Sequence, residues 1–245
     1  MRTMVVGASS GVGRCIAVGL AQRGAHVALL ARRKELLDEA AAEAGSDAFG
    51  VECDVTDEAS CRAAVSTAAS KLGGIDALVY ATGIGQLSRL ADTDATLWRR
   101  TFDTNVIGAA LITSAAIGAL TESAGTAAYL SSVSASHTPP WPGLGSYLVS
   151  KAALDKLVEA WRTEHPHVAF TRIVLGDCNA PSQFANSWDT ELAAEVMPLW
   201  VEQNLLAGAL IDVEQLVSVV DAVLRGGPSL SIPSVAVIPR PIAPT

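Results

Sequence analysis

Short runs of apolar and β-branched residues alternate with longer, alanine-rich amphipathic stretches along most of the 245-residue chain. The runs have the length of buried strands, and the stretches have the length and apolar period of helices. Strands are expected near 3–6, 27–30, 48–52, 77–80, 126–130, 168–175 and 234–238, and helices near 11–23, 34–44, 58–71, 95–120, 144–163 and 213–224. Because a strand reaches a parallel neighbour only through a covering helix, the alternation predicts an α/β fold. We expect one domain over residues 1–245, a doubly wound parallel sheet flanked by helices on both faces.

Composition and charge exclude several classes of function. The net charge of −8 gives no general attraction to nucleic acid or to anionic lipid, so neither is expected as a partner. The longest apolar stretch, 108–120, is too short to cross a bilayer, and glycines interrupt the start of the chain where a signal peptide would need a continuous apolar region. The four cysteines form no CxxC pair and no metal-ligand spacing, so we expect reduced thiols, no metal and a cytoplasmic location.

A glycine-rich segment, GASSGVG, lies between the first expected strand and the first expected helix. Its glycines permit a tight turn and close backbone approach, so that the free N–H groups of the helix can face a phosphate. An ordinary strand-to-helix loop is the alternative, but the position after the first strand favours the pyrophosphate of a dinucleotide. The residues expected to bind it are Gly7, Ser9, Ser10, Gly11, Val12 and Gly13.

The end of the second expected strand indicates which dinucleotide is bound. Ala31 occupies the place where an acid would bind a ribose 2′-hydroxyl, and Arg32 and Arg33 follow at once. Arginine suits a 2′-phosphate because it carries a permanent charge and several fixed donors. The arginines could instead be the solvated start of a helix. We expect NADP(H) as the cofactor, with NAD(H) as the second choice.

Tyr147 and Lys151 lie four residues apart at the start of an expected helix, where they share one face. A lysine charge near a phenol favours the phenolate, which would lower the tyrosine pKa from about 10 and make a general acid/base for an alcohol. Ser131 and Ser132 end the preceding strand at the same sheet edge, where a hydroxyl could bond a developing oxyanion. These side chains predict proton transfer to or from a carbonyl or alcohol oxygen.

The chain resembles the short-chain dehydrogenase/reductase family, in its short single-domain branch with a Rossmann-like fold. The resemblance covers nearly the whole chain. It rests on GASSGVG, on CDVTD with Asp54, on FDTNVIGA with Asn105, on the Ser-Ser strand end, on PGLGSYLVSK and on Leu175-Gly176.

The resemblance implies a role for each matched position. Tyr147 exchanges a proton with the substrate oxygen, Lys151 binds the nicotinamide ribose and eases that proton off, and Ser132 positions the carbonyl. Asn105 supports a water that links Lys151 to solvent. The remaining cofactor contacts, including the adenine ligand Asp54, are expected at Asp54, Val55, Gly83 and Gly176.

The chain departs from the family pattern at three places. Tyr80-Ala81-Thr82-Gly83 replaces the usual Asn-Asn-Ala-Gly, so Gly83 is kept as a contact and Tyr80 is interpreted as a packed strand residue. The family's usual spacing of thirteen residues before the tyrosine selects Ser134, whereas the matching strand end selects Ser132; we choose Ser132 and leave Ser134 as the alternative. The threonine that relatives place after Pro-Gly is missing, so backbone groups or Ser182 would hold the nicotinamide.

Residues 177–206 lose the regular alternation and carry several large apolar side chains, among them Trp188 and Trp200. We interpret this segment as a substrate lid over a small, uncharged, moderately hydrophobic carbonyl or alcohol, although an apolar lid could equally be an oligomer contact. The helix around 106–120 has small or apolar residues on nearly all faces, and by resemblance we expect a homodimer or homotetramer. The rival interpretation of the whole chain is a non-catalytic dinucleotide sensor that kept the fold without turnover.

Overall fold

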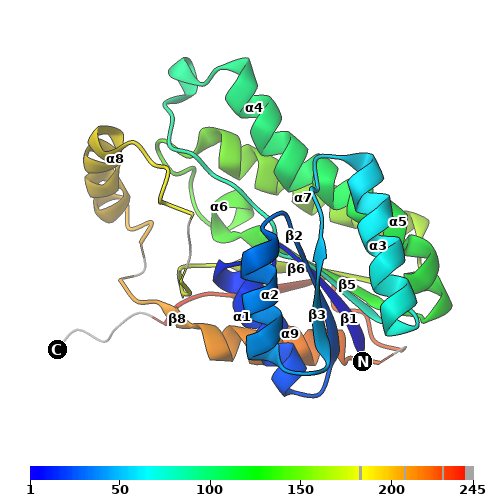
Figure 1. Cartoon of the computed structure of the whole chain (residues 1–245). Coiled ribbons are helices and arrows are strands. Elements are labelled where there is room, and N and C mark those ends of the chain that lie inside the picture. The colour runs from blue at the N-terminus through cyan, green and yellow to red at the C-terminus, as the bar shows by residue number, and fades with distance from the viewer. Residues whose placement is uncertain (182–183, 207, 228, 241–245) are drawn as a thin grey trace.

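A single sheet of seven parallel strands runs through the computed structural model, in the order β3-β2-β1-β4-β5-β6-β9 (Figure 1). The structure describes residues 1–181, 184–206, 208–227 and 229–240. The strands are β1 Arg2–Val6, β2 His26–Ala31, β3 Ala48–Glu52, β4 Ala77–Tyr80, β5 Thr126–Ser132, β6 Ala169–Leu175 and β9 Ser234–Val237. Two further short strands, β7 Cys178–Asn179 and β8 Ile211–Asp212, pair with each other outside the sheet.

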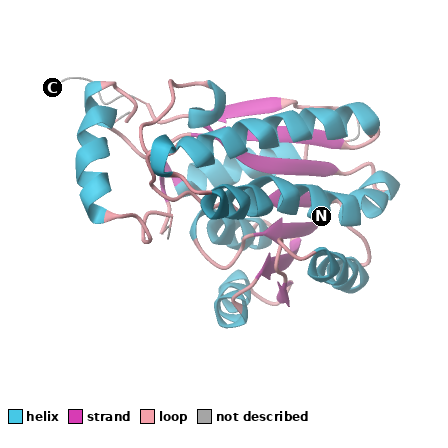
Figure 2. Cartoon of the chain, turned by 90° about the horizontal axis from the view of Figure 1, so that it is seen from above, coloured by secondary structure: helices cyan, strands magenta, loops and turns pink. Residues whose placement is uncertain are grey.

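Helices cover both faces of the sheet, as Figure 2 shows from above. One face carries α3 Glu58–Leu72, α5 Gly108–Glu122 and α7 Gly145–Glu164, and the other carries α1 Gly11–Gln22, α2 Lys34–Ala44 and α9 Val213–Leu224. The central strands are buried on both faces, which explains why they consist of unbroken apolar runs instead of alternating ones. The expected doubly wound α/β fold is confirmed.

The chain order places a crevice beside β1. From β1 the chain moves outward to β2 and β3, and it then returns across the sheet to form β4 on the other side of β1. The loops that follow β1 and β4 therefore leave the sheet in opposite directions, which opens a space beyond the carboxyl ends of the two strands. The functional residues expected from the sequence lie at this edge.

The helix predicted near 95–120 is longer than its sequence pattern indicated. It comprises α4 Ala95–Phe102, a π-helical turn Asp103–Ile107 and α5, with no break between them. Residues 108–120, which are too short to cross a bilayer by themselves, are part of this longer helix. By length and composition alone, its 28 residues Ala95–Glu122 could cross a membrane. In the fold, its buried side chains pack against the sheet and α3.

The segment interpreted as irregular contains a helix, α8 Thr190–Glu202. The Asp189 carboxylate caps its start by accepting from the Leu192 N–H at 2.8 Å. Pro198 lies inside α8, where it has no N–H to donate, and this proline hid the helix from sequence reasoning. Figure 1 shows α8 set apart from the sheet. The short helix α6 Val133–Ser136 was also not expected.

Candidate active site

The glycine turn after β1 is too closely packed for side chains. Gly7 has φ +87°, and a Cβ on it would lie 2.7 Å from Thr82 Oγ1 and 2.8 Å from the Thr82 nitrogen. A Cβ on Gly13 would lie 2.3 Å from the Gly7 oxygen. The turn therefore holds the start of α1 against the loop that follows β4, and only hydrogen atoms fit at the contacts.

The first turn of α1 faces a large cleft. Ser10 precedes the helix, but within the described part of the chain its hydroxyl caps no N–H of α1. It accepts instead from Arg33 Nη2 at 2.8 Å, and Ser9 Oγ accepts from the same nitrogen at 2.9 Å. Free N–H groups and the positive end of the helix dipole suit a phosphate, so the glycine turn fits the pyrophosphate of a dinucleotide.

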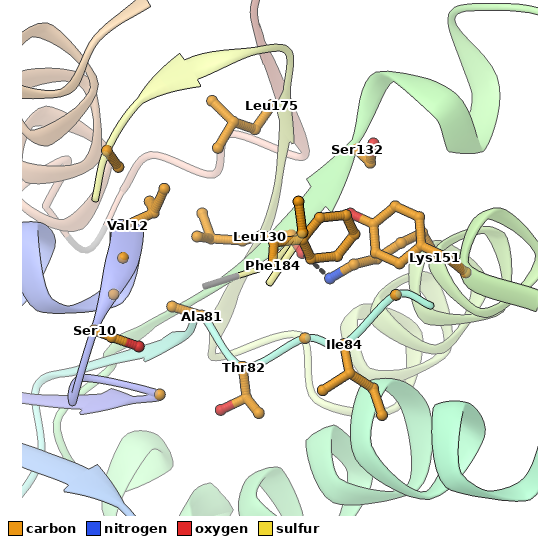
Figure 3. A pocket seen from close by; sticks show the side chains of 18 of the residues that line it. Ser10, Val12, Ala81, Thr82, Ile84, Leu130, Ser132, Lys151, Leu175 and Phe184 are labelled. Carbon is orange, nitrogen blue, oxygen red and sulfur yellow. Dashed lines mark hydrogen bonds between the residues drawn. The ribbon is translucent and has the colours of Figure 1, made fainter. Parts of the chain in front are cut away.

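The cleft has a volume of about 770 Å³ and extends from the glycine turn to the catalytic residues expected on α7. Figure 3 shows the loop through Ala81, Thr82 and Ile84 running between Ser10 and Lys151. Sequence reasoning placed sixteen residues at the cofactor or the chemistry from separate motifs. The cleft brings fourteen of them together: Gly7, Ser9, Ser10, Gly11, Val12, Gly13, Arg32, Arg33, Val55, Gly83, Ser132, Tyr147, Lys151 and Gly176.

Asp54 and Asn105 stand outside the cleft lining among the described residues. The Asp54 carboxylate accepts from the Thr56 N–H at 3.0 Å and from the Thr56 hydroxyl at 2.8 Å, and these bonds lower the pKa of Asp54. Its neighbours Cys53 and Val55 line the cleft in its place. The adenine role expected for Asp54 stays a prediction, and the carboxylate has a structural role in the turn.

Tyr147 and Lys151 meet the end of β5 at the far end of the cleft. Lys151 Nζ donates to the Leu130 carbonyl at 2.8 Å, and it lies 5.8 Å from the centroid of the Tyr147 ring. The Lys151 side chain is only 4% exposed, so its charge is almost entirely removed from water. Gly83 leaves room for it, because a Cβ there would lie 3.2 Å from Lys151 Nζ.

Burial shifts both titrating groups toward their neutral forms. It raises the pKa of Tyr147 to about 12, opposed by a hydrogen bond with the side chain of Ser132. It lowers the pKa of Lys151 to about 8, opposed by the nearby charge of Asp155. The lowered phenol pKa expected from the sequence is therefore wrong for the protein itself, because desolvation outweighs the opposing effect of Ser132.

The two candidate serines form one hydrogen-bonded pair. Ser132 Oγ and Ser134 Oγ are 2.9 Å apart, and Ser132 Oγ also accepts from the Ser134 N–H at 3.2 Å as the cap of α6. Both line the cleft, and the side chain of Ser132 lowers the pKa of Tyr147 against the effect of burial. Sequence spacing alone left two candidates because the two serines, two residues apart in the chain, are hydrogen-bonded to each other at the same place.

Asn105 is buried in the π-helical turn, where its amide holds two neighbouring segments. Its Oδ1 accepts from the Ile84 N–H at 2.9 Å, and its Nδ2 donates to the Ile84 carbonyl and to Ser150 Oγ, each at 2.9 Å. Ser150 Oγ in turn donates to the Tyr147 carbonyl at 2.6 Å. Asn105 thus ties the loop after β4 to the first turn of α7.

An aromatic wall closes the substrate end of the cleft. Phe184 packs edge-on against Tyr147 at 5.0 Å between ring centroids, and Trp188, Trp200 and Trp141 continue the row at 5.6, 5.8 and 5.2 Å. All three indole N–H groups are bonded, to Gly85 O, Pro142 O and Thr138 Oγ1 respectively. Trp188 and Trp200 were expected here from the sequence, whereas Phe184 was missed because no regular pattern surrounds it in the sequence.

The loop after β6 forms the remaining wall. Gly176 donates to the Val237 carbonyl at 2.9 Å, and Asp177, which sequence reasoning did not assign, lines the cleft half-buried with its pKa raised by burial. Burial raises the pKa of Cys178 to about 11, which agrees with a packed thiol. Ser182, the alternative nicotinamide contact, lies outside the described residues. Within those residues, no group of three His, Cys, Asp or Glu side chains could hold a metal.

Comparison with known proteins relates this site to one family. Residues 2–191 match the family described as short chain dehydrogenase. A short chain dehydrogenase from Pseudocercospora fijiensis is 36% identical over 168 residues, which cover 66% of this chain and 53% of that protein. 11-beta-hydroxysteroid dehydrogenase A from Sesamum indicum is 36% identical over 179 residues, covering 71% and 51%. The chain spans about half the length of these curated relatives.

Solved structures share the fold over nearly the whole chain. A short-chain type dehydrogenase/reductase from Mycobacterium marinum superposes with a TM-score of 0.84 at 27% identity, over 97% of this chain and 93% of that one. An alcohol dehydrogenase from Thermococcus sibiricus in complex with 5-hydroxy-NADP gives 0.83 at 22% identity, over 99% and 98%. A 3-ketoacyl-(acyl-carrier-protein) reductase from Brucella melitensis in complex with NADH gives 0.81 at 23% identity, over 96% of each chain.

The sequence match and the fold agree with the order of glycine turn, strand-end serine and Tyr-x-x-x-Lys pair along the cleft. The chain therefore belongs to the short chain dehydrogenase family, whose members are oxidoreductases that bind nicotinamide dinucleotides.

Proposed function

We propose that the protein is an NADP(H)-preferring oxidoreductase that interconverts a carbonyl and an alcohol on a small, uncharged, moderately hydrophobic substrate. The observation that carries the proposal is the cleft that joins the glycine turn to the half-buried Tyr147 and Ser132 and the buried Lys151. The bound dinucleotide would supply or accept the hydride. Assembly into dimers or tetramers and a cytoplasmic location stay predictions of the sequence.

The protein's own groups would handle the proton. The Tyr147 phenol is protonated in the buried site, so it would donate to a carbonyl oxygen as that oxygen gains charge. Ser132, whose side chain acts on the pKa of Tyr147, would hold the same oxygen in place. The Lys151 ammonium, fixed by the Leu130 carbonyl, would stabilise the phenolate that results. The aromatic wall would exclude water and accept an apolar body.

The substitution Tyr147→Phe tests the proposed function directly. Loss of the proton donor is expected to lower kcat by about 10² to 10⁴ with NADPH and a panel of ketones and aldehydes, while NADPH still binds. Turnover is followed by NADPH absorbance and binding by fluorescence. An active Tyr147→Phe enzyme would contradict the mechanism, and binding without turnover by the unsubstituted protein across the panel would favour the sensor.

Separate alanine substitutions distinguish the two serines. Ser132→Ala is expected to lower kcat by about 10² to 10³, the usual cost of removing one donor from a developing oxyanion. Ser134→Ala is expected to lower it by less than about tenfold, because Ser134 acts through Ser132. Steady-state kinetics of both variants with one substrate decide the assignment, and a Ser132→Ala enzyme with full activity would transfer the role to Ser134.

Cofactor preference is tested at the end of β2. Arg32→Ala and Arg33→Ala are each expected to raise the KM for NADP(H) by about ten- to a hundredfold, because each removes a charged donor from a 2′-phosphate, and to change the KM for NAD(H) by less than about twofold. Arg14→Ala is the matched control. Arg14 lies in the first turn of α1, but its guanidinium pairs with the Glu43 carboxylate at 2.9 Å, so its loss should not change the KM for NADP(H). A higher kcat/KM with NAD(H) in the unsubstituted protein would contradict the preference.

Lys151 is expected to titrate near its lowered pKa of about 8, far below its ordinary value of 10.5. The negative charge of Asp155 stabilises the ammonium, so Asp155→Asn should lower the pKa of Lys151 further. Carbon-13 NMR of the lysine Cε groups measures the titration. Glu159→Gln is the control, because the Glu159 carboxylate pairs with Lys156 and Arg172. An unshifted titration in Asp155→Asn would contradict this electrostatic account.

A further inference from the structure

Tyr80 ends β4 with a fully buried side chain, yet its hydroxyl has a specific partner. The Oη donates to the backbone carbonyl of Thr104 at 2.6 Å. Burial raises the pKa of Tyr80 well above its usual value, opposed by a hydrogen bond with the side chain of Thr82, so the phenol stays protonated and remains a donor. A buried phenol in a strand thus reaches the helix that lies over it.

Thr104 belongs to the π-helical turn Asp103–Ile107, one residue before Asn105. A π-helical turn is less favourable than the α-helix on either side of it, so it persists only where other contacts fix it. On the side of the sheet, Tyr80 donates a hydrogen bond to this turn. On the other side, the Asn105 amide is hydrogen-bonded to Ile84 and to Ser150. The turn is therefore held from both sides.

Gly108 makes room for the tyrosine hydroxyl where α5 begins. A Cβ at this position would lie 2.7 Å from Tyr80 Oη and 2.9 Å from the Cβ of Val55. The glycine has an ordinary helical backbone, φ −58° and ψ −39°, so its conformation does not require glycine. Space for the Tyr80 hydroxyl and for Val55 is what requires glycine here, so Tyr80 and Gly108 fit each other between the sheet and the helix.

We propose that Tyr80 is a positioning residue, whose hydroxyl holds the π-helical turn so that Asn105 fixes the Ile84 loop and, through Ser150, the first turn of α7. Tyr80 is absent from the described lining of the cleft, so it acts through Asn105 and not on the substrate. The inference rests on the proposed function, because the loop and the helix turn that it fixes carry Gly83 and Tyr147. It assigns to Tyr80 more than the packing role expected from the sequence.

The chain supplies a matched control for this hydroxyl. Tyr129 is the direct neighbour of Tyr80 in the parallel register of β4 and β5, and it is also fully buried. Its hydroxyl is 2.7 Å from Thr113 Oγ1 in α5, beyond the π-helical turn. Tyr80→Phe removes the buried hydrogen bond to Thr104 and Tyr129→Phe removes the one to Thr113, and each variant is expected to lower the Tm by about 2 to 4 °C.

Only the Tyr80 variant should affect catalysis. Tyr80→Phe is expected to lower kcat by about tenfold through misplacement of the catalytic groups, with KM within about twofold, whereas Tyr129→Phe keeps the unsubstituted kcat. In an Asn105→Ala background, Tyr80→Phe should cause no further loss of kcat, because the Asn105 amide through which Tyr80 acts is already absent. Equal losses of kcat in the two phenylalanine variants, or the same tenfold loss in both backgrounds, would overturn the proposal.

Hydrogen exchange tests the inference without any turnover. The Ile84 amide, bonded to Asn105 Oδ1, should exchange about tenfold faster in Tyr80→Phe and at the original rate in Tyr129→Phe. Unchanged exchange in Tyr80→Phe would refute the positioning role even if the protein is an active enzyme. Faster exchange in a protein with no carbonyl or alcohol turnover would support the role of Tyr80 while the proposed function itself fails.

Discussion

At the carboxyl end of β1, the glycine turn packs directly against the loop after β4, with no room for a side chain between them. A side-chain carbon at Gly7 would overlap the Thr82 backbone, and one at Gly13 would overlap the Gly7 carbonyl. This contact sets the position of α1 against the loop of residues 81–85, and with it both walls of the cleft. One set of backbone contacts thus places the start of α1 against the loop that borders the cleft.

At the far end of the same loop, desolvation is the largest influence on the pKa values of Tyr147 and Lys151. Burial moves Tyr147 and Lys151 toward their neutral forms, opposed by Ser132 for the tyrosine and by Asp155 for the lysine. A protonated phenol is the form that donates to a carbonyl oxygen, whereas a phenolate is the form that accepts from an alcohol. Any charge brought close to this pair acts at low dielectric, so its effect on the two pKa values exceeds what the same charge would do at the surface.

The chain also shows how a missing motif can be replaced. Both asparagines of the family pattern at the end of β4 are absent, and Tyr80 occupies the first of the two positions. The longer side chain spans from the strand to the π-helical turn, and Gly108 provides the space it needs. Interpretation of Tyr80 as a packed residue was therefore accurate for the ring and incomplete for the hydroxyl. A polar atom at the end of a buried side chain needs a partner, and that partner identifies what the residue holds.

The sequence by itself determined the alternation of strands and helices, the bounds of α2, β3, β4 and α9, the glycine turn, and the residue types at the ends of β5 and the start of α7. These features depend on periodicity and on neighbours within a few residues, both of which are present in the amino-acid sequence itself. Only the tertiary structure decided that Pro198 lies inside a helix, that Phe184 stacks on Tyr147, that the phenol pKa is raised, and that Tyr80 bonds Thr104. Each of these depends on what surrounds a residue in space, and burial and long-range contacts leave no periodic pattern along the chain.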